Sequence, residues 1–144
     1  KDIDEEKRKN INKVKFMRDS KETTQKLKNF HLAIISNAET DFVKDICKKE
    51  KVIKYFKEIL GAEKFKNKTT AIKKLMEKYH YKKDQVIFIG DRYTDVIQGK
   101  NAGVITVAKS DGYSWSTKKD LLKVLDGYKG STKFAGSYCP NILI

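Results

Sequence analysis

Three short apolar runs constrain the fold of this chain more than any other feature of its sequence. They cover residues 32–35, 86–89 and 104–107, are rich in β-branched side chains and contain no polar residue except Thr106. Runs that are continuous rather than alternating are typical of strands covered on both faces in a parallel sheet. We therefore predict buried parallel strands at these positions, with a weaker fourth strand at 59–60.

Between these runs, apolar residues recur with the period of a helix. Two amphipathic faces result, one formed by Phe42, Val43, Ile46 and Cys47 and the other by Ile72, Leu75, Met76 and Tyr79. Such spacing predicts helices packed on a sheet. We expect Thr40, and Thr69 or Thr70, to cap their N-termini. Strands that alternate with helices form βαβ units, so the predicted fold is α/β with a doubly wound parallel sheet.

The first 28 residues differ from the rest of the chain. They are highly charged, and their apolar residues are scattered. We predict a helical segment over 1–28, divided near Asp19 and Ser20, and an α/β core over 29–144. Residues 1–28 contain no apolar run long enough for a buried strand, so no such strand precedes residue 32.

Composition limits the class of protein. With 39% apolar and 35% charged residues among 144, the chain suits one soluble domain. No stretch approaches the roughly 18 apolar residues that a membrane span needs, so we expect no membrane partner. Cys47 and Cys139 form no CxxC pair, which argues for a reducing, cytoplasmic compartment and against a disulfide framework or a structural zinc site.

The formal net charge of +13 raises the possibility of a nucleic-acid partner. The lysines, however, are spread along the polar faces of the expected helices, and the aromatic residues are not interleaved with them as stacking platforms. A lysine-biased composition would give the same charge. Nucleic acid is therefore a possible partner that the sequence does not favour.

Polar residues follow two of the predicted strands. Ser36 and Asn37 follow the first, where a hydroxyl, an amide and backbone N–H groups could hold a phosphate oxygen. Gly90 and Asp91 follow the second, with Asp95 at the spacing GDxxxD. Ligands bind at the carboxyl ends of parallel strands, and carboxylates are hard oxygen ligands suited to Mg²⁺.

Lys68 stands just before the helix that contains Ile72, where it could balance the charge of a phosphate and an attacking carboxylate. Each of these polar residues also has an ordinary structural interpretation. Ser36 could be a turn former, Lys68 a solvated surface residue, and Asp95 a helix-start charge favoured by the dipole. The functional interpretation rests on their order along the chain.

In this order the motifs resemble the later motifs of the haloacid dehalogenase superfamily, in its phosphoglycolate-phosphatase-like branch. The resemblance covers about residues 27–125, from Ile34-Ile35-Ser36-Asn37 through Lys68-Thr69-Thr70-Ala71-Ile72 to Phe88-Ile89-Gly90-Asp91 and Asp95. It implies that Ser36 and Asn37 bind the phosphoryl group and that Asp91 binds Mg²⁺. Asp95 would bind Mg²⁺ directly or through water, or orient the motif lysine.

The resemblance leaves two assignments open. Lys68 is the preferred motif lysine, and Lys66 is the competing choice. Arg92 could contact the substrate, although an exposed arginine at a helix start is the simpler interpretation.

The family's first motif, a buried strand that ends in DxD, has no clear equivalent here. Its first Asp is the nucleophile that becomes phosphorylated. Asp2-Ile3-Asp4 matches the pattern DxD, but no apolar strand precedes it. In the family this strand is central, flanked by the strands that end at Ser36 and Gly90, and without it buried backbone groups would be left unpaired.

We therefore expect the chain to be the C-terminal portion of a longer polypeptide, or another chain to supply the strand. Residues 1–28 would then be the remnant of a cap domain or its exit helix.

The leading hypothesis is part of a Mg²⁺-dependent phosphohydrolase that acts on a small phosphate monoester through an aspartyl-phosphate. One alternative is a catalytically inactive module for binding or assembly. An upstream apolar strand that ends in DxD would favour the enzyme, and its absence the module. A second alternative is a nucleic-acid-directed phosphatase domain, which predicts oligonucleotide binding that weakens steeply with salt.

Overall fold

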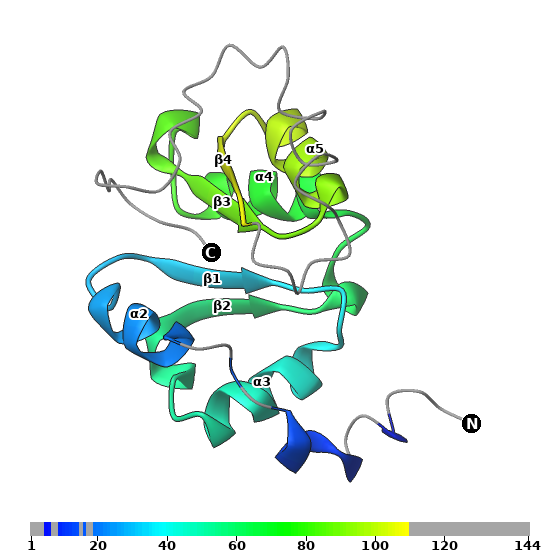
Figure 1. The fold of residues 1–144 in the computed structure, drawn as a ribbon. Helices are drawn as coiled ribbons and strands as arrows, with labels where there is room; N and C mark the ends of the chain where they lie inside the picture. Colours follow the sequence, from blue (N-terminus) through cyan, green and yellow to red (C-terminus); the bar gives the residue numbers. More distant parts are fainter. Residues whose placement is uncertain (1–4, 7–8, 15, 17–18, 110–144) are drawn as a thin grey trace. The chain divides into compact units, whose positions relative to one another are not determined.

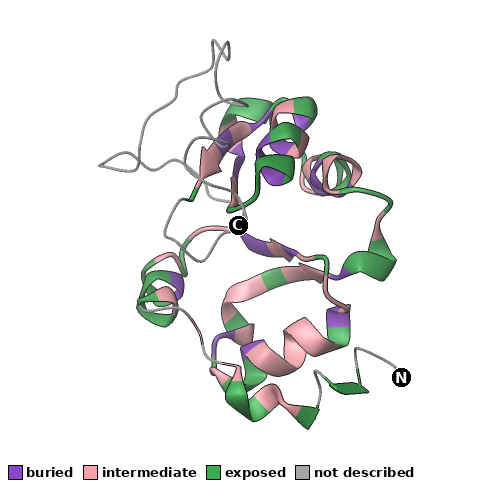
Figure 2. Ribbon diagram, turned by 45° about the vertical axis from the view of Figure 1, so that its right-hand side comes forward, coloured by how far each residue is buried: buried purple, intermediate pink, exposed green. Residues whose placement is uncertain are grey.

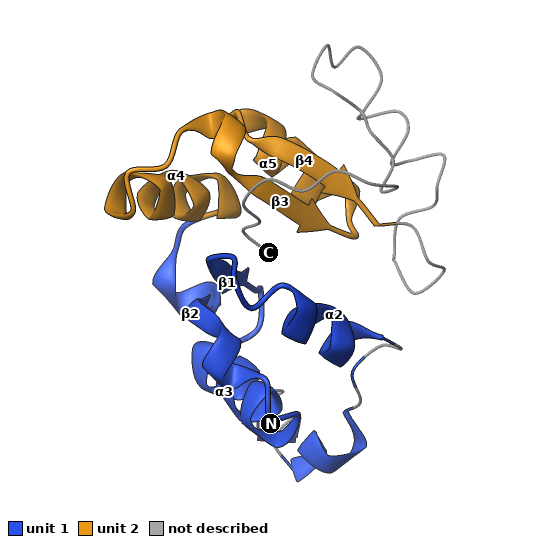
Figure 3. Ribbon diagram, turned by 90° about the vertical axis from the view of Figure 1, so that its left-hand side faces the viewer, with its two compact units in different colours: residues 1–66 blue, residues 67–144 orange. Residues whose placement is uncertain are grey.

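A computed structural model describes residues 5–6, 9–14, 16 and 19–109 of the chain (Figure 1). The chain divides into two compact units, Lys1–Lys66 and Asn67–Ile144, which Figure 3 colours separately. The predicted division of the chain into a helical segment over 1–28 and an α/β core over 29–144 stays a prediction, and residues 110–144 of that core lie outside the described residues. The origin of the helical segment as a cap remnant stays a prediction too.

The first unit is built around one βαβ element. Strand β1 (Leu32–Ile35) leads through helix α3 (Thr40–Lys49) to strand β2 (Phe56–Leu60). The two strands are parallel, with Ile34 opposite Ile59, and they lie side by side in Figure 1. The shorter helical elements of this unit are η1 (Ile11–Lys13), α2 (Ser20–Lys26), η2 (Ile53–Tyr55) and η3 (Ala62–Lys64).

The second unit contains a second βαβ element preceded by a helix. Helix α4 (Lys68–Lys78) and the turn η4 (Lys83–Gln85) lead to strand β3 (Ile87–Gly90), helix α5 (Tyr93–Ala102) and strand β4 (Ile105–Ala108). Strands β3 and β4 are parallel, and α5 packs against both strands and against α4. Helix α5 ends at Gly103, whose φ of 80° lies in the left-handed region that glycine adopts at low cost.

These elements confirm the α/β class predicted from the apolar runs. Each run forms a strand within one residue of its predicted place, and α2 begins at Ser20, beside the predicted break. The predicted helix caps are wrong. Glu39 is the cap residue of α3, and Asn67 is that of α4, where its side chain accepts a hydrogen bond from the Thr70 N–H. Asn67 lies two residues before Thr69, and its side-chain oxygen can cap a helix as a threonine hydroxyl can.

Each pair of strands forms a separate two-stranded sheet. Within residues 19–109, β1 pairs with β2 and β3 pairs with β4, and the structure shows no further strand pairing there. Leu32 and Ala33 of β1 are nonetheless fully buried, and so is most of Phe88 in β3. Figure 2 shows buried residues along these strands and along one side of α4 and α5. These strands therefore have the burial of inner strands and the pairing of edge strands.

Among the described residues, no helix is long and apolar enough to cross a membrane.

Gly99 sets the distance between α5 and its sheet. A Cβ built on Gly99 would lie 2.4 Å from Thr106 Oγ1 and 2.9 Å from Phe88 Cδ1. Both side chains are buried, and Thr106, being β-branched, is stiff at χ1, so there is little room for either to move aside. A glycine is therefore required by close packing at this position.

We expect Gly99→Ala to destabilise the protein by about 1 to 3 kcal/mol through overpacking, as measured by urea unfolding. Helix propensity alone would make the variant more stable, because alanine is more favourable than glycine in a helix by about 1 kcal/mol. Asn101→Ala, at an exposed position of the same helix, is the control and should change stability by less than about 0.5 kcal/mol. A stabilised Gly99→Ala protein would contradict this packing argument.

Candidate active site

Ser36 and Asn37 form the turn that follows β1. The Ser36 N–H donates to the Leu60 carbonyl at 2.9 Å, which continues the ladder of β1 and β2 by one residue. The Ser36 Oγ accepts from the Ala38 N–H at 3.1 Å. This bond uses a lone pair of the hydroxyl and leaves its hydrogen to donate elsewhere. Ser36 is half-buried and Asn37 is exposed, so the turn offers donors to a ligand in solvent.

The start of α3 is held by the loop that follows β2. The buried Thr40 Oγ1 accepts from the Gly61 N–H at 2.8 Å, and the Thr40 N–H donates to Glu63 Oε2 at 3.2 Å. The hydrogen bond from Thr40 holds the pKa of Glu63 below its usual range. A polar cleft of about 390 Å³ opens here, lined by Glu39, Thr40, Asp41, Lys44, Glu63 and Lys64. The Ser36 turn therefore leads into a helix with a firmly anchored N-terminus.

Lys68 and Asp95 form a buried ion pair in the second unit. Lys68 Nζ lies 2.8 Å from Asp95 Oδ1, and the two side chains are 11% and 5% exposed. The other carboxylate oxygen, Oδ2, accepts from the Arg92 N–H at 3.3 Å. The Phe88 ring lies 5.9 Å from the ammonium, within the range of a cation–π contact. Both oxygens of Asp95 thus accept hydrogen bonds from the protein itself.

Gly90 makes room for this carboxylate. A Cβ built on Gly90 would lie 2.3 Å from the Cβ of Asp95 and 2.9 Å from its Cγ. The glycine of the GDxxxD motif is therefore needed because the side chain of Asp95 folds back over the end of β3. Its backbone lies outside the left-handed region, so close approach is the reason for the glycine here.

The structure shows where the other predicted residues lie. Asp91 follows the last residue of β3, and its side chain is exposed; so are those of Arg92 and Lys66. Of the two candidate lysines, Lys68 is the one that pairs with Asp95. Ser36 and Asn37 lie together in the first unit, and Lys68, Asp91 and Asp95 lie in the second. Within the described residues, no group of three or more acidic, histidine or cysteine side chains forms a metal site.

Gln98 is a site residue that the sequence analysis missed. Its side-chain oxygen accepts from the backbone N–H groups of Lys68 and Thr69, at 2.5 and 3.3 Å. No local pattern could have indicated this contact, because Gln98 lies 30 residues after Lys68. In the sequence, Gln98 is simply a polar residue that follows the expected helix start near Asp95.

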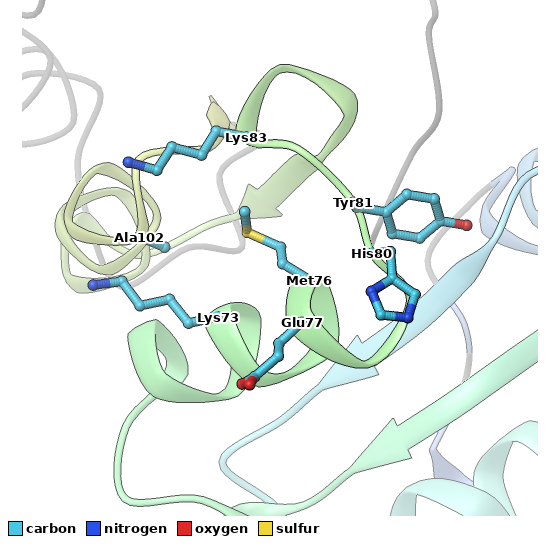
Figure 4. A pocket seen from close by; sticks show the side chains of 7 residues that line it. All are labelled: Lys73, Met76, Glu77, His80, Tyr81, Lys83 and Ala102. Carbon is cyan, nitrogen blue, oxygen red and sulfur yellow. The ribbon is translucent and has the colours of Figure 1, made fainter.

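Two further features lie apart from these residues. An open groove of about 610 Å³ in the second unit contains none of the predicted site residues and is lined by Lys73, Met76, Glu77, His80, Tyr81, Lys83 and Ala102 (Figure 4). In the first unit, burial raises the pKa of the Cys47 thiol to about 11. Cys47 is therefore protonated near neutral pH and unsuited to act as a nucleophile.

Comparison with known proteins places the chain in a family. Residues 1–109 match the family profile of haloacid dehalogenase-like hydrolases. The chain belongs to this family, and the match confirms the resemblance found in its motifs. The match also includes the first 28 residues, which the motifs did not cover.

Curated relatives lie in the expected branch. The chain is 32% identical over 99 residues to a phosphoglycolate phosphatase of Vibrio parahaemolyticus, covering 65% of this chain and 43% of the relative. It is 30% identical over 88 residues to that of Vibrio cholerae, covering 59% and 39%. The chain thus spans about two fifths of the length of these relatives.

Solved structures agree on the fold. A haloacid dehalogenase-like hydrolase from Streptococcus pneumoniae matches with a TM-score of 0.72 and 19% identity, over 95% of this chain and 59% of that one. A predicted phosphatase from Clostridium acetobutylicum matches with a TM-score of 0.71 and 25% identity, over the same shares. The α/β fold of the chain is therefore that of the family.

We expect Lys68 and Asp95 to be energetically coupled. Unfolding free energies of the wild type, Lys68→Met, Asp95→Asn and the double variant should give a coupling of about 1 to 3 kcal/mol, because each single change leaves the partner buried without its counterpart. The exposed pair Glu22 and Lys26, 2.7 Å apart, is the matched control and should show a clearly smaller coupling. Additive effects at Lys68 and Asp95 would show that the ion pair does not form in solution.

Proposed function

We propose that this chain supplies the phosphate-binding and metal-binding part of a Mg²⁺-dependent phosphohydrolase that acts on small phosphate monoesters. The observation that carries the proposal is the buried pair of Lys68 and Asp95, which lies against Gly90 at the carboxyl end of β3. Asp91 is the next residue along the chain. A buried ammonium suits the charge of a phosphate, and an exposed carboxylate at the end of the same strand suits a divalent cation. The family membership and the phosphatase relatives support the same reaction class.

The residues take distinct roles in this proposal. Ser36 and Asn37 donate hydrogen bonds to phosphate oxygens, and the Lys68 ammonium neutralises charge on the phosphoryl group and on the attacking carboxylate. Asp95 orients Lys68, because both of its oxygens already accept protein hydrogen bonds. The exposed Arg92 is a further candidate for contact with the phosphate.

Asp91 is the residue that would bind Mg²⁺. Its carboxylate is a hard oxygen ligand, exposed at a strand end, and Mg²⁺ commonly uses one or two protein carboxylates with water and substrate oxygens. Bound Mg²⁺ would reduce the repulsion between the phosphate and an attacking carboxylate. The fit is in the ligand chemistry of Asp91, because the oxygens of Asp95 already accept hydrogen bonds from Lys68 and Arg92.

The nucleophile of the proposed reaction is an aspartate outside the described residues. Its carboxylate oxygen would form a bond to phosphorus while the bond to the ester oxygen breaks, and water would then release inorganic phosphate from the aspartyl-phosphate. We propose that an upstream segment or another chain supplies this aspartate on an additional strand that completes the sheet. The support is that β1 and β3 are buried yet paired on one edge within the described part. The sequence upstream of Lys1 tests this point: without an apolar strand that ends in DxD, a non-catalytic module becomes the better proposal.

A phosphoglycolate-like ester is the first substrate to test, because the curated relatives are phosphoglycolate phosphatases. A reducing, cytoplasmic setting is part of the same proposal. It is supported by the buried, free thiol of Cys47.

We expect Asp91→Asn in the full-length protein to abolish Mg²⁺-dependent hydrolysis of an aryl phosphate, measured as release of the phenol. The amide keeps the shape of the side chain but loses the charge that would hold the cation. Asp84→Asn, at an exposed position in the same unit, should retain wild-type activity. Activity retained by Asp91→Asn would overturn the assignment of Asp91.

A further inference from the structure

The first turn of α4 presents backbone N–H groups that have no partner within the helix. Asn67, the residue before the helix, accepts from the Thr70 N–H at 2.9 Å. The Lys68 and Thr69 N–H groups are satisfied from another helix, because both donate to Gln98 Oε1 of α5. A side chain 30 residues away thus completes the cap of α4.

The backbone of Gln98 also accepts a hydrogen bond from α4. The Thr69 hydroxyl donates to the Gln98 backbone carbonyl at 3.0 Å. One residue of α5 therefore receives three hydrogen bonds from the first two residues of α4. This arrangement fixes the position of the Lys68 backbone relative to α5.

Helix α5 also holds the other end of the same lysine. Asp95 lies one turn before Gln98 on α5, and its carboxylate binds the Lys68 ammonium at 2.8 Å. The Lys68 backbone and the Lys68 ammonium are thus anchored to adjacent turns of one helix. We propose that Gln98 is a positioning residue that sets where the Lys68 ammonium lies, by fixing the backbone from which that side chain extends. Only the catalytic consequence of this inference rests on the proposed function.

The chemical reason is that electrostatic stabilisation depends on a preorganised charge. A lysine has a long, flexible side chain, so a carboxylate alone fixes its ammonium only as well as the backbone behind it is fixed. A displacement of about 1 Å can lower a rate by roughly 100-fold. Gln98 would therefore affect turnover without touching substrate.

The first test needs no activity. Gln98→Leu removes the acceptor at similar size, Gln98→Glu keeps it, and Gln85→Leu is the control. Gln85 caps the Lys82 N–H at 2.8 Å in the same unit. Trace labelling with acetic anhydride, read by peptide mass spectrometry, compares Lys68 with the exposed Lys74 of the same helix. Gln98→Leu should remove the protection of Lys68 relative to Lys74, whereas Gln98→Glu and Gln85→Leu should preserve it.

The second test uses the full-length protein with Mg²⁺ and an aryl phosphate. Gln98→Leu should lower kcat by roughly 10- to 100-fold with a smaller change in KM. Gln98→Glu, which keeps the acceptor, should retain most of the wild-type kcat. In the Lys68→Met background, Gln98→Leu should cause no further loss, because Gln98 acts through Lys68.

The outcomes separate this inference from the proposed function. If the wild type hydrolyses no phosphate ester, the proposed function fails, and Lys68 labelling still decides the positioning role. If a folded Gln98→Leu protein keeps Lys68 protected, the inference is overturned whatever the activity shows. It is also overturned if Gln98→Leu lowers activity equally with and without Lys68, since Gln98 would then act by another route.

Discussion

The buried pair of Lys68 and Asp95 is the interaction on which the second unit depends. Removing two charges from water costs several kcal/mol for each ion, and only close pairing with further hydrogen bonds offsets that cost. The structure provides both, through the 2.8 Å contact and the Arg92 N–H on the second oxygen. To keep the pair, the N-termini of α4 and α5 must stay adjacent. The packing of these two helices is therefore part of the site.

The packing of α5 on strands β3 and β4 depends on two positions where a side chain would not fit. Gly90 lets the Asp95 side chain cover the end of β3, and Gly99 lets α5 approach Phe88 and Thr106. The two glycines act on opposite ends of the same helix, so α5 is held close to its sheet along its whole length. Backbone geometry thus helps to fix the position of the Asp95 carboxylate, and the Lys68 ammonium is its ion-pair partner.

The sequence predicted what depends on local pattern and missed what depends on distant contacts. The three strands at the apolar runs were placed within one residue because four-residue apolar runs have few alternatives, whereas the weaker fourth, predicted at 59–60, is the longer strand Phe56–Leu60. The order of Ser36, Lys68, Asp91 and Asp95 was enough to indicate the family. The cap at Asn67 was missed because several neighbouring residues could cap equally well. The resemblance to the family preferred Lys68 over Lys66 and allowed Asp95 to orient it, whereas the contact itself depends on how two helices pack, which no single-sequence pattern encodes.

In each of the two units, a distant side chain accepts a hydrogen bond from the N-terminus of a helix. Each has a helix whose N-terminus lies beside candidate site residues, and each supplies that N-terminus with an acceptor from a distant segment. Glu63 receives the Thr40 N–H across 23 residues, and Gln98 receives the Lys68 N–H across 30. A local cap would fix a helix end relative to its own chain, whereas these caps fix it relative to a neighbouring element. Within each unit, such a cap therefore fixes the start of a helix relative to the neighbouring segment as well as stabilising the helix.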